Sequence, residues 1–363
     1  GSEWTTSFSA TFEAGQSWPT LAFGNYVDET NPDGPFEACD KNYLLRPAAR
    51  SFGPRIPLEP GFCALSMLFS DWQRNGVPDL RVSNDRQYYK GGQEQLWHME
   101  ATPRLWTEKE GWQRLRIWGM GIAAHDLDAD GFNEYYLTSM ADNKLQTLKA
   151  PPKDGSAPKP TFKDIGWPKG VTAHRPFTGD DLRPSTAWHI DFQDVNNDGL
   201  ADLFIAKGNV DQMPSNAIHD PNNLLIQQPD GSFAEKADVA GIATTERSRG
   251  AALADFDLDG RLDLVVVNRR APMEIYRNET AGTGHWITVK LDQSSGNRNA
   301  VGAVVVAEGH GGVVGRFVNH PVAGAVGVEV ITEKWGDDFN HANVIDQAKR
   351  SGAVIGHRRE GVV

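Results

Sequence analysis

Asp255-Phe-Asp257-Leu-Asp259-Gly260-Arg-Leu-Asp263 runs directly into the apolar segment Leu264-Val-Val-Val267. Oxygen-bearing side chains stand at positions 1, 3, 5 and 9 of this nine-residue loop, and glycine stands at position 6, where the backbone must turn sharply. This spacing is typical of a loop that surrounds a hard cation such as Ca²⁺ with oxygen atoms. The β-branched residues after it predict a short strand.

The same pattern occurs four times in the chain. We call residues 71–79, 126–134, 194–202 and 255–263 acidic loops 1 to 4. Their side chains at positions 1, 3, 5 and 9 are the predicted calcium ligands: Asp71, Gln73, Asn75, Asp79, Asp126, Asp128, Asp130, Glu134, Asp194, Asn196, Asp198, Asp202, Asp255, Asp257, Asp259 and Asp263. Because acidic loop 1 carries amides at positions 3 and 5, we expect it to bind metal loosely or not at all.

Two other interpretations of an acidic loop are an EF-hand and an ordinary solvated turn. An EF-hand needs a glutamate at position 12 and flanking helices, whereas position 12 here is Val82, Leu137, Ile205 or Val266 within an apolar segment. A solvated turn would explain one copy. Four copies in register, each followed by a predicted strand, favour repeated calcium loops.

The net charge of −12 has a local origin. The four acidic loops hold 13 carboxylates at their ligand positions, which exceeds the whole negative excess. Four bound Ca²⁺ ions would leave a balance of about −4, so metal binding accounts for the acidity. We therefore expect no nucleic-acid partner. The chain also has no apolar run of the roughly 18 residues that a membrane-spanning helix requires.

The chain contains two cysteines, Cys39 and Cys63. A disulfide between them would stabilise the fold by about 3.5 kcal/mol in the chain-entropy model. Two buried thiols are the alternative. Calcium sites and a disulfide would both favour an exported location, meaning a secreted, periplasmic or cell-surface protein.

A longer unit repeats around the loops: a lead-in strand, the acidic loop, a second strand, a variable stretch and a third strand. Counting a degenerate first copy from Asn25, the units start 46 to 68 residues apart, which is the size of a four-stranded propeller blade with insertions. In that first copy, Leu21–Tyr26 is the predicted lead-in strand. We expect an all-β propeller of seven blades, with six as the alternative, in which residues 5–12 and strands after Trp286 supply the remaining blades.

These repeats resemble the FG-GAP/VCBS blades of integrin alpha-type propellers. The segments His285–Leu291 and Asn297–Ala303 resemble the start of the ASPIC/UnbV module of cartilage acidic protein-like proteins. The resemblance implies a calcium-stabilised propeller over residues 1–283. It implies an ASPIC/UnbV-like segment over residues 284–363, which completes the propeller or packs on it.

In a four-stranded blade, the acidic loops would lie at one end of the ring and the long variable stretches at the other. Seven residues of those stretches form the predicted ligand-binding set: His174, Arg175, Arg183, Arg247, Arg249, Arg269 and Arg270. Arginine pairs well with carboxylate, sulfate or phosphate, so we expect an anionic protein or glycan partner. The alternative is that these arginines only solvate loops or pair with neighbouring acidic residues.

The sequence therefore predicts a calcium-binding module for binding or adhesion. We assign no catalytic residue, because serine-hydrolase, zinc-protease, phosphate-loop and Cys-x-x-Cys motifs do not occur in the sequence. The alternative function is a polysaccharide-processing propeller, a lyase or hydrolase that uses a loop carboxylate or His174 at the ring opening.

Overall fold

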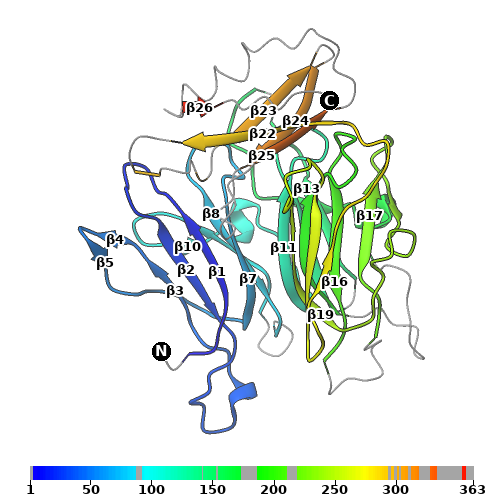
Figure 1. Ribbon diagram of the computed structural model, residues 1–363. Helices are drawn as coiled ribbons and strands as arrows, with labels where there is room; N and C mark the ends of the chain where they lie inside the picture. The colour runs from blue at the N-terminus through cyan, green and yellow to red at the C-terminus, as the bar shows by residue number, and fades with distance from the viewer. Residues whose placement is uncertain are drawn as a thin grey trace.

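The computed structural model is built almost entirely from antiparallel β-sheets (Figure 1). It describes residues 3–86, 92–140, 142–152, 154–172, 186–210, 219–292, 296–297, 301, 304–309, 312–318, 328–332 and 354–356. Five sheets follow one another along the chain with their strands paired in chain order, and we call them blades 1 to 5.

Each blade is a simple meander. Blade 1 contains β1 (Thr5–Thr11), β2 (Thr20–Asn25), β3 (Asn42–Leu45) and β6 (Ile56–Leu58), and blade 2 contains β7 (Ala64–Ser70), β8 (Asp79–Asn84), β9 (Gln95–His98) and β10 (Arg104–Leu105). Blade 3 contains β11 (Gly119–His125), β12 (Glu134–Ser139), β13 (Lys144–Leu148) and β14 (Phe162–Asp164). Blade 4 contains β15 (Ala187–Gln193), β16 (Asp202–Lys207), β17 (Asn223–Gln227) and β18 (Phe233–Glu235), and blade 5 contains β19 (Ser248–Ala254), β20 (Asp263–Asn268) and β21 (Glu274–Tyr276).

The remaining elements are short or lie outside the blades. The hairpin β4 (Pro47–Ala48) and β5 (Ser51–Phe52) belongs to the connection between β3 and β6, and the helical turns are η1 (Pro35–Glu37), η2 (Glu108–Glu110) and α1 (Gly166–Lys169). After blade 5 come β22 (His285–Asp292), β23 (Val304–Gly309), β24 (Gly312–Val318), β25 (Val328–Thr332) and β26 (Val354–Gly356). Figure 1 shows these last strands lying across one end of the blades.

Successive blades pack face to face through their first strands: β1 lies beside β7, β7 beside β11, β11 beside β15, and β15 beside β19. Side chains alternate between the two faces of a sheet. In blade 4, Leu203 and Ile205 pack towards blade 3, whereas Phe204 and Ala206 pack towards blade 5. We call the face towards the preceding blade the leading face and the other the trailing face.

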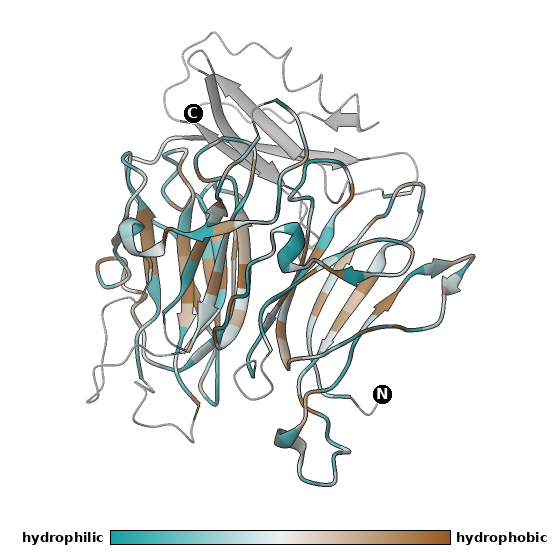
Figure 2. Ribbon diagram, turned by 180° about the vertical axis from the view of Figure 1, so that it is seen from behind, coloured by the Kyte–Doolittle hydropathy of each residue, from teal (hydrophilic) through white to brown (hydrophobic). Residues whose placement is uncertain are grey.

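Four apolar clusters fill the four junctions between the five blades. The junction between blades 2 and 3 is the most aromatic, with Trp72, Trp112, Tyr135 and Phe162 buried together. Figure 2 shows hydrophobic residues concentrated along the strands and hydrophilic residues in the connections. Alternation of side chains along each strand therefore gives a blade two apolar faces, and packing of successive blades buries these faces at the four junctions.

The propeller-like architecture agrees with the sequence prediction, but the number of blades differs. The described residues form five blades, whereas we predicted seven or six. Beyond blade 5, the strands form a three-stranded sheet of order β25–β22–β26 and a separate pair β23–β24, neither of which is a meander in chain order.

The assignment of the first blade also needs correction. We predicted Leu21–Tyr26 as a lead-in strand, but β2 is the second strand of blade 1, and β1 supplies the first. The lengthened segment Asp28–Asp33 therefore lies in the connection between β2 and β3, away from the position of an acidic loop. The alternation in residues 5–12 belongs to this blade and cannot supply another, which accounts for part of the difference in number.

A disulfide joins Cys39, in the β2–β3 connection, to Cys63, in the crossover from blade 1 to blade 2, with Cα atoms 4.8 Å apart. It therefore ties two neighbouring connections together at the end of the blades opposite the acidic loops. Within the residues that the structure describes, no helix is long and apolar enough to cross a membrane.

Candidate metal centres

The four acidic loops each join the first and second strands of blades 2 to 5, and they share one backbone conformation. Position 4 is left-handed in every loop, with φ of 57°, 57°, 58° and 63° at Arg74, Ala129, Asn197 and Leu258. Position 6 is glycine with φ of 80°, 93°, 87° and 82° in the same order. The sequence pattern predicted the turn at position 6 but not the one at position 4, where four different side chains occur.

The carboxylate at position 1 organises each loop from within. Its Oδ2 accepts the backbone N–H of the position 6 glycine at 2.8, 2.9, 2.7 and 2.9 Å in acidic loops 1 to 4. In acidic loops 3 and 4 its Oδ1 also accepts the N–H of position 5, at 3.1 and 3.0 Å. The backbone thus curls around this carboxylate and directs the other acidic side chains towards it.

Two groups of carboxylates come close enough to share one cation. In acidic loop 2, Asp126, Asp128 and Asp130 each place one oxygen within 4.8 Å of the others. In acidic loop 4, Asp255, Asp257 and Asp263 do the same. Carboxylate oxygens in this number suit Ca²⁺, which prefers six to eight oxygen ligands.

The residue at position 9 is buried in every loop and connects the loop to the blade. Asp202 is fully buried; its Oδ2 accepts the N–H of Val195 at 3.1 Å and its Oδ1 that of Gln227, at the end of β17, at 2.9 Å. Burial raises the pKa of Asp202 to about 8, and the carboxylates of Asp194 and Asp198 add to this shift. Burial likewise raises the pKa of Glu134 to about 8. A bound cation would favour the ionised forms of both groups.

Acidic loop 1 differs because protein donors already surround its position 9 carboxylate. Asp79 accepts the indole N–H groups of Trp72 and Trp106, both at 2.8 Å, and the backbone N–H of Met99 at 3.0 Å. His98 Nδ1 lies 2.9 Å from Asp79 Oδ1, the oxygen that also accepts the Met99 N–H, whereas both indoles donate to Oδ2. Trp72 belongs to acidic loop 1 itself, whereas Trp106, His98 and Met99 come from later in the chain. These donors leave fewer lone pairs of Asp79 for a cation.

Two arginines that sequence reasoning did not include in the site contact acidic loop 4. Arg277 Nε lies 2.8 Å from Asp257 Oδ2, and Arg261 Nη2 lies 2.5 Å from Asp259 Oδ2. The hydrogen bond from Arg261 lowers the pKa of Asp259. These two arginines thus neutralise part of the negative charge of the loop. Arg277 lies 14 residues beyond the loop, after β21, so the nine-residue pattern could not identify it.

The segment that follows blade 5 contacts acidic loops 3 and 4. Asn278 Nδ2 donates to the carbonyls of Val195 at 2.7 Å and Leu262 at 3.2 Å, and the N–H of Gly284 donates to the carbonyl of Asn197 at 3.1 Å. The ring of Trp286 lies directly over Gly260: a Cβ atom at this position would lie 1.8 Å from Trp286 Nε1. Glycine is therefore required in acidic loop 4 both by its backbone angle and by this ring.

The predicted ligand-binding residues lie only partly within the described structure. His174, Arg175 and Arg183 fall outside it. Arg247, Arg249, Arg269 and Arg270 come together at the end opposite the acidic loops, where the N–H of Arg269 donates to the carbonyl of Arg247 at 3.1 Å. Arg249 is held by the fold, because its guanidinium lies 4.2 Å from the Trp188 ring centre and donates to the carbonyls of Gly208 and Ser248.

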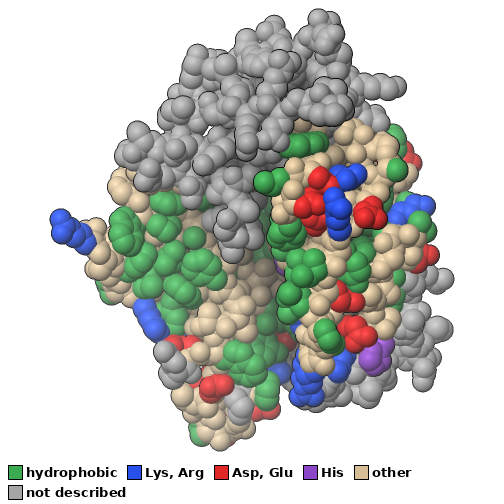
Figure 3. Space-filling model, in the orientation of Figure 1, with side chains coloured by type: hydrophobic (Ala, Val, Ile, Leu, Met, Phe, Trp, Pro, Cys, Tyr) green, Lys and Arg blue, Asp and Glu red, His purple; other side chains and the backbone are tan. Residues whose placement is uncertain are grey.

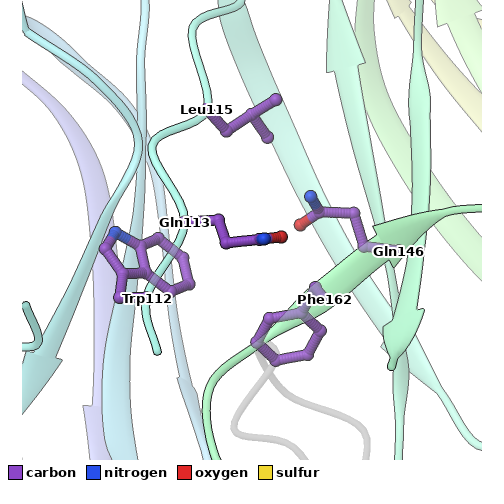
Figure 4. Close-up of a pocket in the computed structure, with 5 residues that line it drawn as sticks. All are labelled: Trp112, Gln113, Leu115, Gln146 and Phe162. Atoms are coloured by element: carbon purple, nitrogen blue, oxygen red, sulfur yellow. The ribbon is translucent and has the colours of Figure 1, made fainter. Parts of the chain in front are cut away.

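A small pocket lies between blades 2 and 3, lined by Trp112, Gln113, Leu115, Gln146 and Phe162 (Figure 4). Beside it, Arg81 is 2% exposed and donates to Gln146, with its guanidinium 5.4 and 5.2 Å from the ring centres of Trp112 and Phe162. Glu94 is also fully buried, and its Oε1 accepts the N–H of Asn84 at 2.9 Å. The pocket has room for roughly one water molecule, so it is a feature of the core.

Comparison with known sequences identifies one repeat type. Residues 194–266, which include acidic loops 3 and 4, match the family model of an FG-GAP-like repeat. Cartilage acidic protein 1 of Mus musculus is 39% identical over 62 residues, which are 17% of this chain and 10% of that protein. The Homo sapiens protein is 40% identical over 57 residues, 15% of this chain and 9% of that protein. The matched part therefore spans about a tenth of these relatives.

Two solved structures have a similar arrangement of sheets. A sialidase of Trypanosoma rangeli in complex with sialic acid aligns with a TM-score of 0.42 and 12% identity, over 75% of this chain and 44% of that chain. The exotype rhamnogalacturonan lyase YesX aligns with a TM-score of 0.42 and 13% identity, over 88% of this chain and 57% of that chain.

The contact between Trp286 and Gly260 predicts a difference between two equivalent glycines. Gly76→Ala places a methyl group in open space and should cost about 1–2 kcal/mol of unfolding free energy, from its left-handed backbone alone. Gly260→Ala has a nearly equal φ but must also displace the indole, which adds about 1–3 kcal/mol. Denaturant unfolding of both variants measures the difference; equal losses would show that Trp286 does not rest on acidic loop 4.

Burial of Glu94 predicts a pH-dependent gain for Glu94→Gln. Burial raises the pKa of Glu94 from 4.5 to about 7, so the protonated form stabilises the fold below pH 4.5, and this contribution is lost as the pH rises through about 7. Glutamine keeps the acceptor for Asn84 and cannot ionise. The variant should match the wild type near pH 5 and exceed its melting temperature near pH 8. A melting-temperature difference that does not change with pH would contradict this.

Proposed function

We propose that this chain is a calcium-binding propeller module of the FG-GAP type that binds another molecule. The observation that carries the proposal is the loop geometry: one backbone conformation recurs in blades 2 to 5, and in blades 3 and 5 three carboxylates of the loop come within 4.8 Å of one another. An ordinary turn does not require oxygen-bearing side chains at positions 1, 3, 5 and 9, yet all four loops have them. Binding of a cation does require several oxygen ligands around one point.

The physical role of calcium in this proposal is structural. Without a cation, the clustered carboxylates of acidic loops 2, 3 and 4 repel one another, and buried members such as Asp202 resist ionisation. Since position 9 also hydrogen-bonds to the end of the third strand in acidic loops 3 and 4, metal binding there would secure the pairing of three strands at once. Acidic loop 2 is a strong candidate, because all four of its ligand positions carry carboxylates and three of them come within 4.8 Å of one another.

An exported location belongs to the same proposal. The disulfide between Cys39 and Cys63 is of the kind that persists in oxidising compartments, which supports a secreted, periplasmic or cell-surface protein. The partial similarity to cartilage acidic protein 1 supports the FG-GAP repeat, and we extend the resemblance to an ASPIC/UnbV-like segment over residues 284–363.

The binding role rests on the end opposite the acidic loops. Arg247, Arg269 and Arg270 gather there on an otherwise acidic protein, and guanidinium groups recognise carboxylate and sulfate by paired hydrogen bonds. We therefore propose an anionic protein or glycan as the partner. Arg249 has a different role in this proposal, because its contacts to Trp188 and to backbone carbonyls make it a support for this surface.

Removal of calcium should lower the stability of the protein. Each site occupied at ten times its dissociation constant contributes about 1.4 kcal/mol, so the melting temperature should rise with added Ca²⁺ and fall with chelator. The double variant Asp128→Asn with Asp130→Asn should bind one Ca²⁺ fewer by metal analysis, whereas the exposed control Asp238→Asn should bind the full number. An unchanged melting temperature in chelator would reject structural calcium.

The binding role has its own test on immobilised sulfated or carboxylated glycans. The double variant Arg269→Ala with Arg270→Ala should bind about tenfold more weakly, a loss of about 1.4 kcal/mol. The control Arg50→Ala removes an exposed arginine from the β4–β5 turn at the other end and should retain wild-type affinity. Retention without product supports a binding module; release of cleaved glycan would instead establish the polysaccharide-processing alternative.

A further inference from the structure

The trailing face of blade 5 is uncovered, although the same face is covered in blades 2, 3 and 4. At equivalent register positions of the third strand, Leu96, Leu145 and Leu224 are 4%, 0% and 8% exposed, and each packs towards the following blade. The equivalent residue of blade 5 is Ile275, which is 66% exposed. This position holds an apolar residue in blades 2 to 5. In blade 5, nothing in the described structure covers it.

The second strand of blade 5 repeats this difference. Ser83, Thr138 and Ala206 are each 0% exposed, whereas Val267 at the same place in the fold is 51% exposed. Val265 and Ala252, which pair across β19 and β20, lie on this same face and add no charge to it. These four positions of the trailing face of blade 5 are thus apolar and uncharged.

The leading face of blade 1 shows the matching exposure. Phe8 is 53% exposed, while its register equivalents Met67 in blade 2 and Ile190 in blade 4 are 6% and 5% exposed. Phe8 packs edge-on against Phe23 of the same face, with ring centres 5.3 Å apart. Figure 3 shows hydrophobic side chains gathered at the surface over blade 1 and along blade 5.

These two surfaces are the two halves of a junction that the chain already builds four times. Every covered junction joins the trailing face of one blade to the leading face of the next. We propose that a second copy of this chain docks the leading face of its blade 1 on the trailing face of blade 5, so that the protein associates head to tail.

A second copy is the occupant that the structure favours, because this chain itself carries the complementary surface in the required register. Both faces lack charged residues at the positions compared, as the four internal junctions do, apart from Arg81 in blade 2. Such a contact is heterologous, since it joins different surfaces of the two partners. The contact involves none of the acidic loops directly.

Sedimentation velocity of the full chain tests the proposal over a dilution series. The wild type should form larger species as its concentration rises. Ile275→Arg, on blade 5, and Phe8→Arg, on blade 1, should each weaken association by about tenfold or more, as expected for the centre of an apolar contact. The matched control Trp167→Arg changes a side chain that is 85% exposed in α1, outside both faces, and should associate like the wild type.

An equal mixture of the two variants distinguishes head-to-tail association from other contacts. Each variant keeps one intact face, so the mixture should form dimers and nothing larger. A wild type that stays monomeric, a mixture that stays monomeric, or association lost only in the blade 5 variant would overturn the proposal. If Ile275→Arg fails to show the wild-type melting transition, Val267→Lys tests the same face.

Discussion

Apolar packing between successive sheets holds this molecule together, because no strand pairing links one blade to the next within the described residues. A few hydrogen bonds cross between blades, such as the one from the Phe69 N–H to Ser9 Oγ, but the junctions are filled by side chains such as Leu203 and Ile205, both completely buried. Full burial of one aliphatic side chain contributes about 1.5–3 kcal/mol. The alternation of side chains between two faces is therefore the constraint from which the rest of the structure follows.

Each acidic loop joins the packed core of its blade through the residue at position 9. Position 9 of each loop is the first residue of the second strand, so the carboxylate of Asp202 immediately precedes Leu203 in the core. Its hydrogen bonds to Val195 and Gln227 fix the start of the strand relative to the loop and to the third strand. The hydrophobic junctions thus support the geometry of the candidate cation sites. Because Asp202 and Leu203 are adjacent in the chain, a change in the packing of the core should also shift the loop, and a change in the loop should shift the core.

The parts of this structure that could be predicted from sequence are those encoded within a short window. The acidic loops, the strands that follow them and the glycine at position 6 all lie within about a dozen residues, where turn chemistry and alternation decide the outcome. The indole of Trp106 beside Asp79 and the guanidinium of Arg277 beside Asp257 could not be found this way, because the blade topology brings them to the loops from separate segments. The misplaced first blade has a similar cause: β1 and β2 both alternate, and residues 12–19 between them lack the acidic spacing that identified the other turns.

The meander also separates charge along the molecule. Connections between first and second strands emerge at one end of every blade, and connections between second and third strands emerge at the other. The chain places its regularly spaced carboxylates in the first set, and Arg269 and Arg270 in the second. The proposed anionic partner would therefore meet these arginines without coming near the candidate cation sites. The β-strands between the two ends keep the opposite charges of one blade apart, so neither set neutralises the other.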